Sequence, residues 1–340
     1  MQKVGILTGG ADCPGLNSVI RAVVRKAALE GYVITGIKNG WDGLIENDMR
    51  VLDLRITTGI LDRGGTILGT SRLSVPLTEE QNQKILENFK RSGIDALIAV
   101  GGEETLKIAL YFYNKHKLPV VGVPKSIDNA LWGTDYAFGF DTAVNVATEC
   151  IDRLHTTAES HHRIIVIEVM GRYTGWIALQ AGIAGGADLI FIPEIPVNIE
   201  EVCDALRDRH ERGKSFSIIV VSEGAKVEGY FDGQVEKKKI GKHRFGVGEL
   251  IANLIEEKTG FETRVSVLGH VLRGGTPTAY DRVLGTRFGV RAVELIKAKQ
   301  FGKMVSLHNN RIHSVSLAEA VKHPKAIDPE LYEIAKVFFA

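Results

Sequence analysis

The sequence predicts an α/β protein with mostly parallel sheets and helices on both faces of each sheet. Short apolar runs, many of them β-branched, recur along the 340 residues. They are continuous rather than alternating, as expected for strands buried on both faces. Segments with helical spacing of apolar residues separate many of them, and this alternation favours parallel sheets. The expected strands are 4–7, 96–100, 120–123, 164–169, 189–192, 218–221 and 265–268.

The expected helices follow several of these strands. Residues 16–29 carry apolar side chains at helical spacing, and Gly31 supplies a C-terminal cap. Further helices are expected at 105–113, 176–184 and 279–298. The chain length suggests two lobes. Residues 226–245 are polar and basic, which predicts a surface hairpin or a mobile insert, with the lysines at 237–239 forming a solvated face.

Composition excludes several classes of protein. The chain is 44% hydrophobic and 24% charged, and its net charge is +1, so no overall field attracts nucleic acid or a membrane surface. Cys13, Cys150 and Cys203 are far apart and lack metal-ligand spacing, which favours reduced thiols. No apolar run reaches the roughly 18 residues that a membrane span needs. With a strand expected at 4–7, no signal peptide fits, and we expect a soluble, cytoplasmic protein.

The loops that follow strands are where ligands bind in parallel sheets. The first such loop, 8–15, contains three glycines and precedes a helix. Glycines let backbone amides approach a phosphate, and a helix N-terminus favours negative charge. A tight strand-to-helix turn is the alternative interpretation. The loop matches neither the P-loop nor the dinucleotide pattern.

Two further loops carry ionisable side chains. Glu103 and Glu104 follow two glycines after the strand at 96–100. Two interpretations are open. Either the two carboxylates stabilise the dipole of the following helix, or Glu103 helps to hold Mg²⁺ beside a phosphate. Lys125 and Asp128 follow the strand at 120–123. The lysine is suited to neutralise a phosphate and the aspartate to accept a hydroxyl proton, although a simple turn is the alternative.

Arginines near strand ends complete the pattern. Arginine clamps phosphate with two hydrogen bonds, although a single arginine more often forms a surface ion pair. His270, taken alone, is more typical of a buried structural histidine. A metal-binding acid, a base and several arginines together predict phosphoryl transfer to an acceptor that already carries a phosphate. The arginines are Arg72, Arg163, Arg172, Arg264 and Arg273.

Long motifs in order resemble the 6-phosphofructokinase family over nearly the whole chain. The resemblance implies Mg²⁺ as cofactor, fructose 6-phosphate as acceptor, and a homodimer or homotetramer with shared active sites. It implies two Rossmann-like lobes, with 1–139 plus about 272–322 binding the donor and 140–271 plus about 323–340 binding the sugar phosphate. The motifs are LTGGADCPGLNSVIRAVVR, RGGTILGTSR, AVGGEET, PKSIDN, GTDYAFGFDTA, IDRLHTTAESHHR, EVMGRYTGW, AGGADLIFIPE and TRVSVLGHVLRGGTPTAYDR.

The resemblance also implies roles for individual residues. The catalytic base falls on Asp128 with the hydroxyl of Ser126 beside it, the metal-associated acid on Glu103, and the transition-state arginines on Arg72 and Arg172. Donor contacts fall on Gly10, Ala11, Arg72, Gly102, Glu104, Thr105 and Lys125. Sugar-phosphate contacts fall on Ser126, Asp128, Met170, Gly171, Arg172, Glu223, His270 and Arg273, and on Arg163 and Arg264 reaching over from a neighbouring subunit.

The phosphoryl donor depends on Glu104 and Lys125. Well-known ATP-using members carry glycine at both places, whereas pyrophosphate users carry an acid and a lysine. A carboxylate at 104 adds bulk and negative charge where the rest of a nucleotide would lie. Because lysine occurs with either donor in the bacterial mixed ATP and pyrophosphate group that the chain resembles, Glu104 favours pyrophosphate, with ATP as the alternative.

Three positions depart from the family pattern. Ala130 stands where the catalytic loop has a second aspartate, Ala11 replaces a glycine of the phosphate loop, and Leu272 replaces a polar residue. A catalytically weak binding or regulatory paralogue is therefore an alternative of another class. A lipid or dinucleotide kinase is a further alternative, against which the GHVLRGG and MGR stretches argue.

Overall fold

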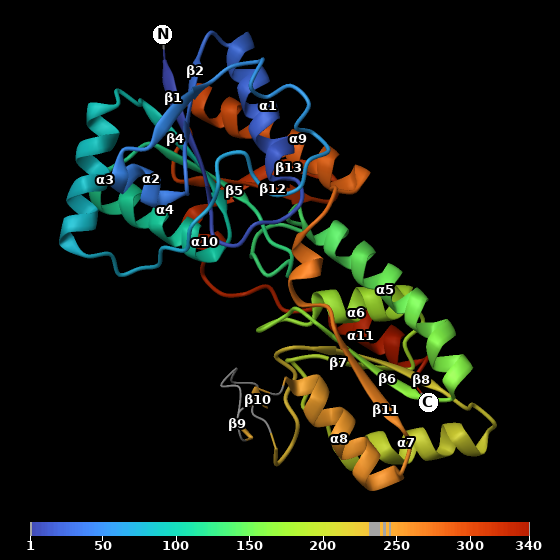
Figure 1. Cartoon of the computed structure of the whole chain (residues 1–340). Helices are drawn as coiled ribbons and strands as arrows, with labels where there is room; N and C mark the ends of the chain where they lie inside the picture. Colours follow the sequence, from blue (N-terminus) through green and yellow to red (C-terminus); the bar gives the residue numbers. More distant parts are fainter. Residues whose placement is uncertain (1, 231–238, 241–242, 245, 340) are drawn as a thin grey trace. The chain divides into compact units, whose positions relative to one another are not determined.

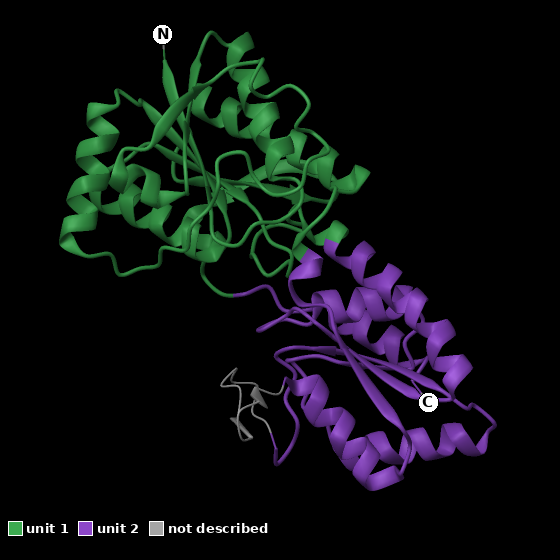
Figure 2. Cartoon of the chain, viewed as in Figure 1, with its two compact units in different colours: residues 1–142, 273–323 green, residues 143–272, 324–340 purple. Residues whose placement is uncertain are grey.

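A computed structural model describes residues 2–230, 239–240, 243–244 and 246–339. The chain divides into two compact units, Met1–Thr142 with Arg273–His323, and Ala143–Leu272 with Pro324–Ala340 (Figure 2). Each unit has its own sheet flanked by helices (Figure 1). The predicted α/β class with mostly parallel sheets is confirmed.

The described residues of unit 1 form a seven-stranded sheet in the order β13-β12-β5-β4-β1-β2-β3. The five inner strands are parallel, and β3 and β13 pair antiparallel at the two edges. The continuous apolar runs predicted as strands occupy the centre, where both faces are covered. The strands are β1 (Lys3–Gly9), β2 (Val33–Ile37), β3 (Met49–Leu52), β4 (Ala96–Gly101), β5 (Val120–Pro124), β12 (Lys303–His308) and β13 (Arg311–Ser316).

Helices cover both faces of this sheet (Figure 1). One face carries α1 (Leu16–Leu29) and α9 (Ala279–Lys297), and the other carries α2 (Trp41–Glu46), α3 (Glu79–Arg91), α4 (Glu103–His116) and α10 (Leu317–Ala320). α1 and α9 approach closely, since a Cβ on Gly289 would lie 2.8 Å from the Cβ of Ala22. On the opposite face, the rings of Trp41 and Phe112 stack with centroids 5.6 Å apart in the buried core.

Unit 2 contains the parallel sheet β11-β6-β8-β7. Helix α5 begins in unit 1 and continues into unit 2. The strands are β6 (Ile164–Val169), β7 (Leu189–Phe191), β8 (Ser217–Ser222) and β11 (Thr263–Val267). One face carries α5 (Phe140–His161), α6 (Trp176–Ala184) and α11 (Pro329–Lys336), and the other carries α7 (Ile199–Glu211) and α8 (Val247–Thr259). The short 3₁₀ helix η1 (Gly269–Arg273) follows β11.

The basic segment 226–245 is described only in part. β9 (Lys239–Ile240) and β10 (His243–Arg244) pair antiparallel, as the strands of a hairpin do. Residues 231–238, 241–242 and 245, and with them two of the three consecutive lysines, lie outside the described residues. Among the helices that are described, none has the length and apolar composition to cross a membrane.

Asp281 ties the start of α9 to the start of α5. Its side chain is fully buried, and its Oδ2 accepts hydrogen bonds from the backbone N of Thr142 at 2.9 Å and from its Oγ1 at 2.5 Å. Within the described residues the other oxygen, Oδ1, has no hydrogen-bond partner. Burial raises the pKa of Asp281 to about 6, against the opposing effect of the Thr142 hydrogen bonds.

We expect Asp281 to make stability fall as pH rises from about 4 to about 6. The pKa of this carboxyl is about 6 in the folded state and 3.8 ordinarily. Protonation therefore stabilises the folded state relative to the unfolded state, and this stabilisation is lost as pH rises through the folded pKa. Asp281→Asn removes this titration. The difference in unfolding free energy between wild type and variant should therefore change by up to about 3 kcal/mol across the window.

Urea unfolding at several pH values between 4 and 7 measures this difference. Asp48→Asn is the control, because it removes an exposed carboxylate paired with Lys38 rather than a buried one. A constant offset between Asp281→Asn and wild type would contradict the prediction.

Candidate active site

The glycine loop after β1 is tied to the segment that carries Arg72. The backbone N of Gly10, which has a φ of 79°, donates to the carbonyl oxygen of Ser71 at 2.8 Å. The Thr70 hydroxyl donates back to the carbonyl oxygen of Gly10 at 2.5 Å. These bonds hold the exposed Arg72 next to the loop, although the two are about 60 residues apart in sequence.

Lys125 lies beneath the same loop. It is only 5% exposed, and its ammonium donates a hydrogen bond to the carbonyl oxygen of Ala11. A Cβ added to Gly10 would lie 3.5 Å from Nζ. Burial lowers the pKa of Lys125, and the nearby charge of Arg273 acts in the same direction, while Asp128 and Asp12 raise it. A poorly solvated ammonium at a glycine loop is well placed to meet an anion.

Thr105 joins the glycine loop to the loop after β4. Its side chain is 3% exposed and fills the space left by two glycines. A Cβ on Gly101 would lie 2.4 Å from the Cβ of Thr105, and one on Gly9 would lie 2.6 Å from its Oγ1. Gly102 then caps α4 in an extended conformation. The predicted donor-contact residues of these two loops are thereby brought together in unit 1.

Glu103 and Glu104 share one counter-charge. The ammonium of Lys107 lies 2.8 Å from Glu103 Oε1 and 2.9 Å from Glu104 Oε1. Hydrogen bonds to the two carboxylates raise the pKa of Lys107. Sequence reasoning missed Lys107, although its spacing of three and four residues from the acids is the usual signal for a helical ion pair.

The described residues contain no cluster of three or more His, Cys, Asp or Glu side chains able to hold a metal. Mg²⁺ is usually bound by one or two carboxylates together with phosphate oxygens. Glu103, at the start of α4 and partly exposed, fits this donor set only when a phosphate is bound as well. The metal role of Glu103 stays a prediction.

The turn after β5 presents Ser126 and Asp128. The backbone N of Asp128 donates to Ser126 Oγ at 3.2 Å. Asn129 has a φ of 50°, and its side chain bonds the carbonyl oxygen of Asp135 and the backbone N of Ala137, each at 3.1 Å. Asn129, which sequence reasoning did not single out, thus fixes the turn that carries Asp128.

In unit 2, Met170, Gly171 and Glu223 lie at the carboxyl ends of β6 and β8. The backbone N of Glu223 donates to the carbonyl oxygen of Val169 at 2.8 Å. Gly171 has a φ of 144°, and a Cβ there would lie 2.3 Å from Ser222 Oγ, so only glycine fits. These residues are therefore held by the strands themselves rather than by a free loop.

Arg172 and His270 are exposed. The guanidinium carbon of Arg172 lies 6.0 Å from the ring centre of Tyr173. His270 belongs to η1 and its side chain is exposed, so it is not a buried structural histidine. Arg273, at the end of η1, has a buried Nε without a hydrogen-bond partner in the described part of the chain.

Arg163 and Arg264 lie at the opposite edge of the unit 2 sheet. Arg163 precedes the first residue of β6, and Arg264 is the second residue of β11. Met170 follows the last residue of β6, a strand of six residues and so about 20 Å long. Within one chain, a single phosphate cannot reach both Met170 and Arg163.

The predicted site residues therefore gather in three places. Unit 1 holds Gly10, Ala11, Arg72, Gly102, Glu103, Glu104, Thr105, Lys125, Ser126, Asp128 and Arg273. The carboxyl-end group of unit 2 comprises Met170, Gly171, Arg172, Glu223 and His270, and the strand-start group comprises Arg163 and Arg264.

A sequence model of the family described as phosphofructokinase matches residues 3–296. The chain belongs to the phosphofructokinase family. Among curated relatives, the pyrophosphate–fructose 6-phosphate 1-phosphotransferase of Streptomyces coelicolor is 51% identical, with 99% of this chain and 100% of that protein covered. The ATP-dependent 6-phosphofructokinase 2 of Clostridium perfringens is 49% identical, with 97% and 94% covered. The chain thus belongs to a group of phosphofructokinases named for either donor.

Solved structures of phosphofructokinases share the fold. That of Saccharomyces cerevisiae is 31% identical with a TM-score of 0.83, and the match covers 99% of this chain and 47% of the longer yeast chain. The pyrophosphate-dependent enzyme of Marinobacter aquaeolei has a TM-score of 0.80 at 22% identity, with 97% and 86% covered, and shows the fold alone.

We expect the buried ammonium of Lys125 to cost stability. Its pKa is below 10.5, so the folded state disfavours the charged form, and stability rises as pH increases through the folded pKa. Lys125→Met should therefore raise the free energy of unfolding at pH 7 by roughly 1 kcal/mol or more, because a packed apolar chain replaces a buried charge. This advantage should shrink as pH approaches 10.5.

Denaturant unfolding at pH 7 and pH 10 measures the effect. Lys107→Met is the control and should lower the free energy of unfolding at pH 7, because it removes an ammonium whose pKa is raised by its carboxylate partners. The prediction would be contradicted if Lys125→Met were less stable than wild type and if the difference in unfolding free energy were the same at pH 7 and pH 10.

Proposed function

We propose that the protein transfers a phosphoryl group from pyrophosphate to the 1-hydroxyl of fructose 6-phosphate, giving fructose 1,6-bisphosphate. The reaction needs Mg²⁺, is reversible and serves glycolysis in the cytoplasm. One observation carries this proposal: Lys125 is buried beneath the glycine loop, and Asp128 lies on the turn that follows it directly. A phosphate-binding cation and a carboxylate base thus share one short segment.

The donor end of the proposed reaction uses unit 1. Gly10 lies close to the Lys125 ammonium, so a pyrophosphate at the glycine loop meets a positive charge. Arg72, held next to the loop, supplies a second cation. Mg²⁺ bound to the pyrophosphate and Glu103 would neutralise charge on the donor oxygens.

The acceptor end centres on Asp128. Its carboxylate takes the proton of the 1-hydroxyl while the sugar oxygen forms a bond to phosphorus. The bridging P–O bond of pyrophosphate breaks, and inorganic phosphate leaves. Ser126, hydrogen-bonded to the backbone of Asp128, orients the turn, and Arg72 and Arg172 stabilise the charge of the transferring group.

Recognition of the sugar phosphate uses residues of defined chemistry. Met170 and Gly171 shape the wall at the end of β6, Glu223 accepts hydrogen bonds from sugar hydroxyls, and His270 and Arg273 bind the 6-phosphate. The unsatisfied Nε of Arg273 and the exposure of His270 support this assignment.

Shared active sites in a homodimer or homotetramer are part of the proposal. Arg163 and Arg264 lie at the edge of the unit 2 sheet opposite Met170. They therefore serve the 6-phosphate bound to a second copy of the chain, as the family resemblance implies. This arrangement supports an obligate oligomer rather than an active monomer.

Pyrophosphate is the proposed donor because of the charge at the start of α4. Glu104 puts a carboxylate on the second residue of this helix, where it is about half exposed and paired with Lys107. The adenosine part of ATP would meet its bulk and its negative charge. Relatives named for pyrophosphate are consistent with this choice.

A coupled assay with fructose 6-phosphate and Mg²⁺, run with each donor in turn, tests the proposal. Faster product formation with pyrophosphate supports it. Faster turnover with ATP would agree with the activity of the family but would contradict the assignment of pyrophosphate as the donor. The absence of product with either donor would favour a binding or regulatory paralogue, which Ala130 motivates because the family pattern has a second carboxylate there.

We expect Glu104→Gly to raise turnover with ATP relative to pyrophosphate by at least about tenfold, since bulk and negative charge are both removed. The measurement is kcat/KM for each donor. Glu80→Gly is a matched control, because Glu80 is likewise the second residue of a helix and pairs with Lys84 at 2.6 Å. An unchanged donor ratio in Glu104→Gly would show that Glu104 does not select the donor.

A further inference from the structure

Glu262 lies between the two arginines of the strand-start group in unit 2. Its Oε1 accepts a hydrogen bond from Nη2 of Arg163 at 2.8 Å and another from Nη2 of Arg264. One carboxylate oxygen therefore contacts two guanidinium groups that would otherwise repel each other. The hydrogen bond from Arg163, with the charge of Arg264 in the same direction, lowers the pKa of Glu262, which keeps the carboxylate ionised.

The backbone fixes this position. β6 and β11 pair with Ile164 opposite Thr263, and the backbone N of Ile164 donates to the carbonyl oxygen of Glu262 at 3.0 Å. Arg163 and Glu262 thus stand opposite each other just before the two strands begin. Because side chains alternate along a strand, Glu262 and Arg264 share a face.

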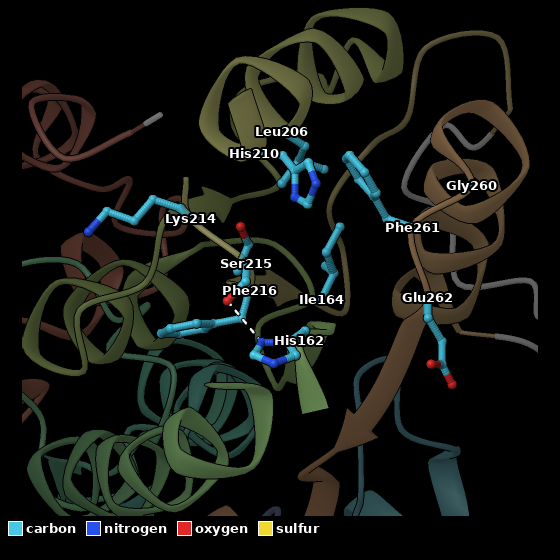
Figure 3. Close-up of a pocket in the computed structure, with 11 residues that line it drawn as sticks. His162, Ile164, Leu206, His210, Lys214, Ser215, Phe216, Gly260, Phe261 and Glu262 are labelled. Carbon is cyan, nitrogen blue, oxygen red and sulfur yellow. Dashed lines mark hydrogen bonds between the residues drawn. The ribbon is translucent and has the colours of Figure 1, made fainter. Parts of the chain in front are cut away.

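The residue before Glu262 is anchored separately. Phe261 lines a cavity of about 170 Å³ at the strand starts, and its ring centre lies 4.9 Å from that of His210. Its backbone N also donates to Thr259 Oγ1 at 3.1 Å. Glu262 lines the same cavity, and Figure 3 shows its carboxylate directed away from His210 and Phe261.

Both arginines keep donors for a further anion. A guanidinium has five N–H groups, and Glu262 occupies one on each arginine. Arg264 spends another on the carbonyl oxygen of Thr263 at 2.8 Å. The Nε of Arg163 is buried and has no hydrogen-bond partner within the described ranges. Two arginines and one carboxylate leave a net charge of +1, which favours a phosphate ester over a neutral sugar.

We propose that Glu262 is a positioning residue that holds Arg163 and Arg264 together as a preassembled clamp for the 6-phosphate of the acceptor. This inference rests on the proposed function, in which that arginine pair binds the sugar phosphate. Without the carboxylate, the two cations separate and must be brought together when the acceptor binds. The free energy needed to bring them together weakens binding of the acceptor and leaves binding of the donor unchanged.

Steady-state kinetics of the full-length protein test this role. Glu262→Gln keeps the shape and removes the charge, and should raise KM for fructose 6-phosphate roughly tenfold, as loss of a charged hydrogen bond does. KM for pyrophosphate and kcat should stay within about twofold, because Glu262 acts through the two arginines that bind the acceptor. Glu262→Asp retains the charge and should recover part of the affinity.

Asp204→Asn is the matched control. Asp204 is also an exposed carboxylate of unit 2, bound to a guanidinium, that of Arg207, at 2.7 Å. Its loss should leave both KM values at the wild-type level. Circular dichroism and thermal melting verify that each variant is folded. If Glu262→Gln does not fold, the KM values of Glu262→Asp are compared with those of wild type instead.

Calorimetric titration of fructose 6-phosphate without donor separates this inference from the proposed function. Wild-type protein that binds the sugar phosphate but turns over neither donor would overturn the function alone. A weaker acceptor affinity in Glu262→Gln with recovery in Glu262→Asp supports the clamp. Equal or tighter binding in Glu262→Gln, or an equal loss for both substrates, overturns it.

Discussion

The hydrogen bond between the Lys125 ammonium and the carbonyl oxygen of Ala11 is the interaction on which the donor side of the site depends. It joins the turn after β5 to the loop after β1, and these two strands lie on either side of β4 in one sheet. Burying an ammonium is unfavourable unless polar groups replace the lost water. A carbonyl oxygen and nearby acidic side chains do so only in part, and the lowered pKa of Lys125 is the result. In the proposed function, a bound anion completes the compensation.

The fold could be predicted where burial decides the pattern. Continuous apolar runs become the inner parallel strands β1, β4 and β5, and the helices 16–29 and 176–184 have the predicted bounds because apolar spacing and a flanking glycine mark them. The inner strands β2 and β12 were missed, and so were the edge strands β3 and β13. The side chains of β3 and β13 are largely half-exposed or exposed, so no apolar run distinguishes them from a loop. Long-range pairing, rather than local preference, makes them strands.

The site was predictable as a set of loops but not as a set of contacts. Parallel strands bring their carboxyl ends to one edge, which is why Lys125 and the glycine loop could be placed near each other from sequence. Thr105 occupies the space beside Gly9 and Gly101, and this packing depends on backbone distances that no sequence motif specifies. Lys107 and Glu262 had local signals, namely helical spacing to two acids and strand spacing to an arginine. Neither residue belonged to a recognised motif, so neither was considered.

Overall similarity cannot select the phosphoryl donor, because relatives named for pyrophosphate and for ATP are 51% and 49% identical to this chain. Selection must then rest on a few side chains beside the donor phosphates. Glu104 begins α4 beside Glu103, and a single ammonium, that of Lys107, balances both carboxylates. The start of α4 therefore keeps a net negative charge, held by one shared ion pair. In the proposed function, a compact pyrophosphate at Lys125 need not extend toward this charge, whereas a nucleotide carries a further phosphate and a sugar that must be accommodated around it.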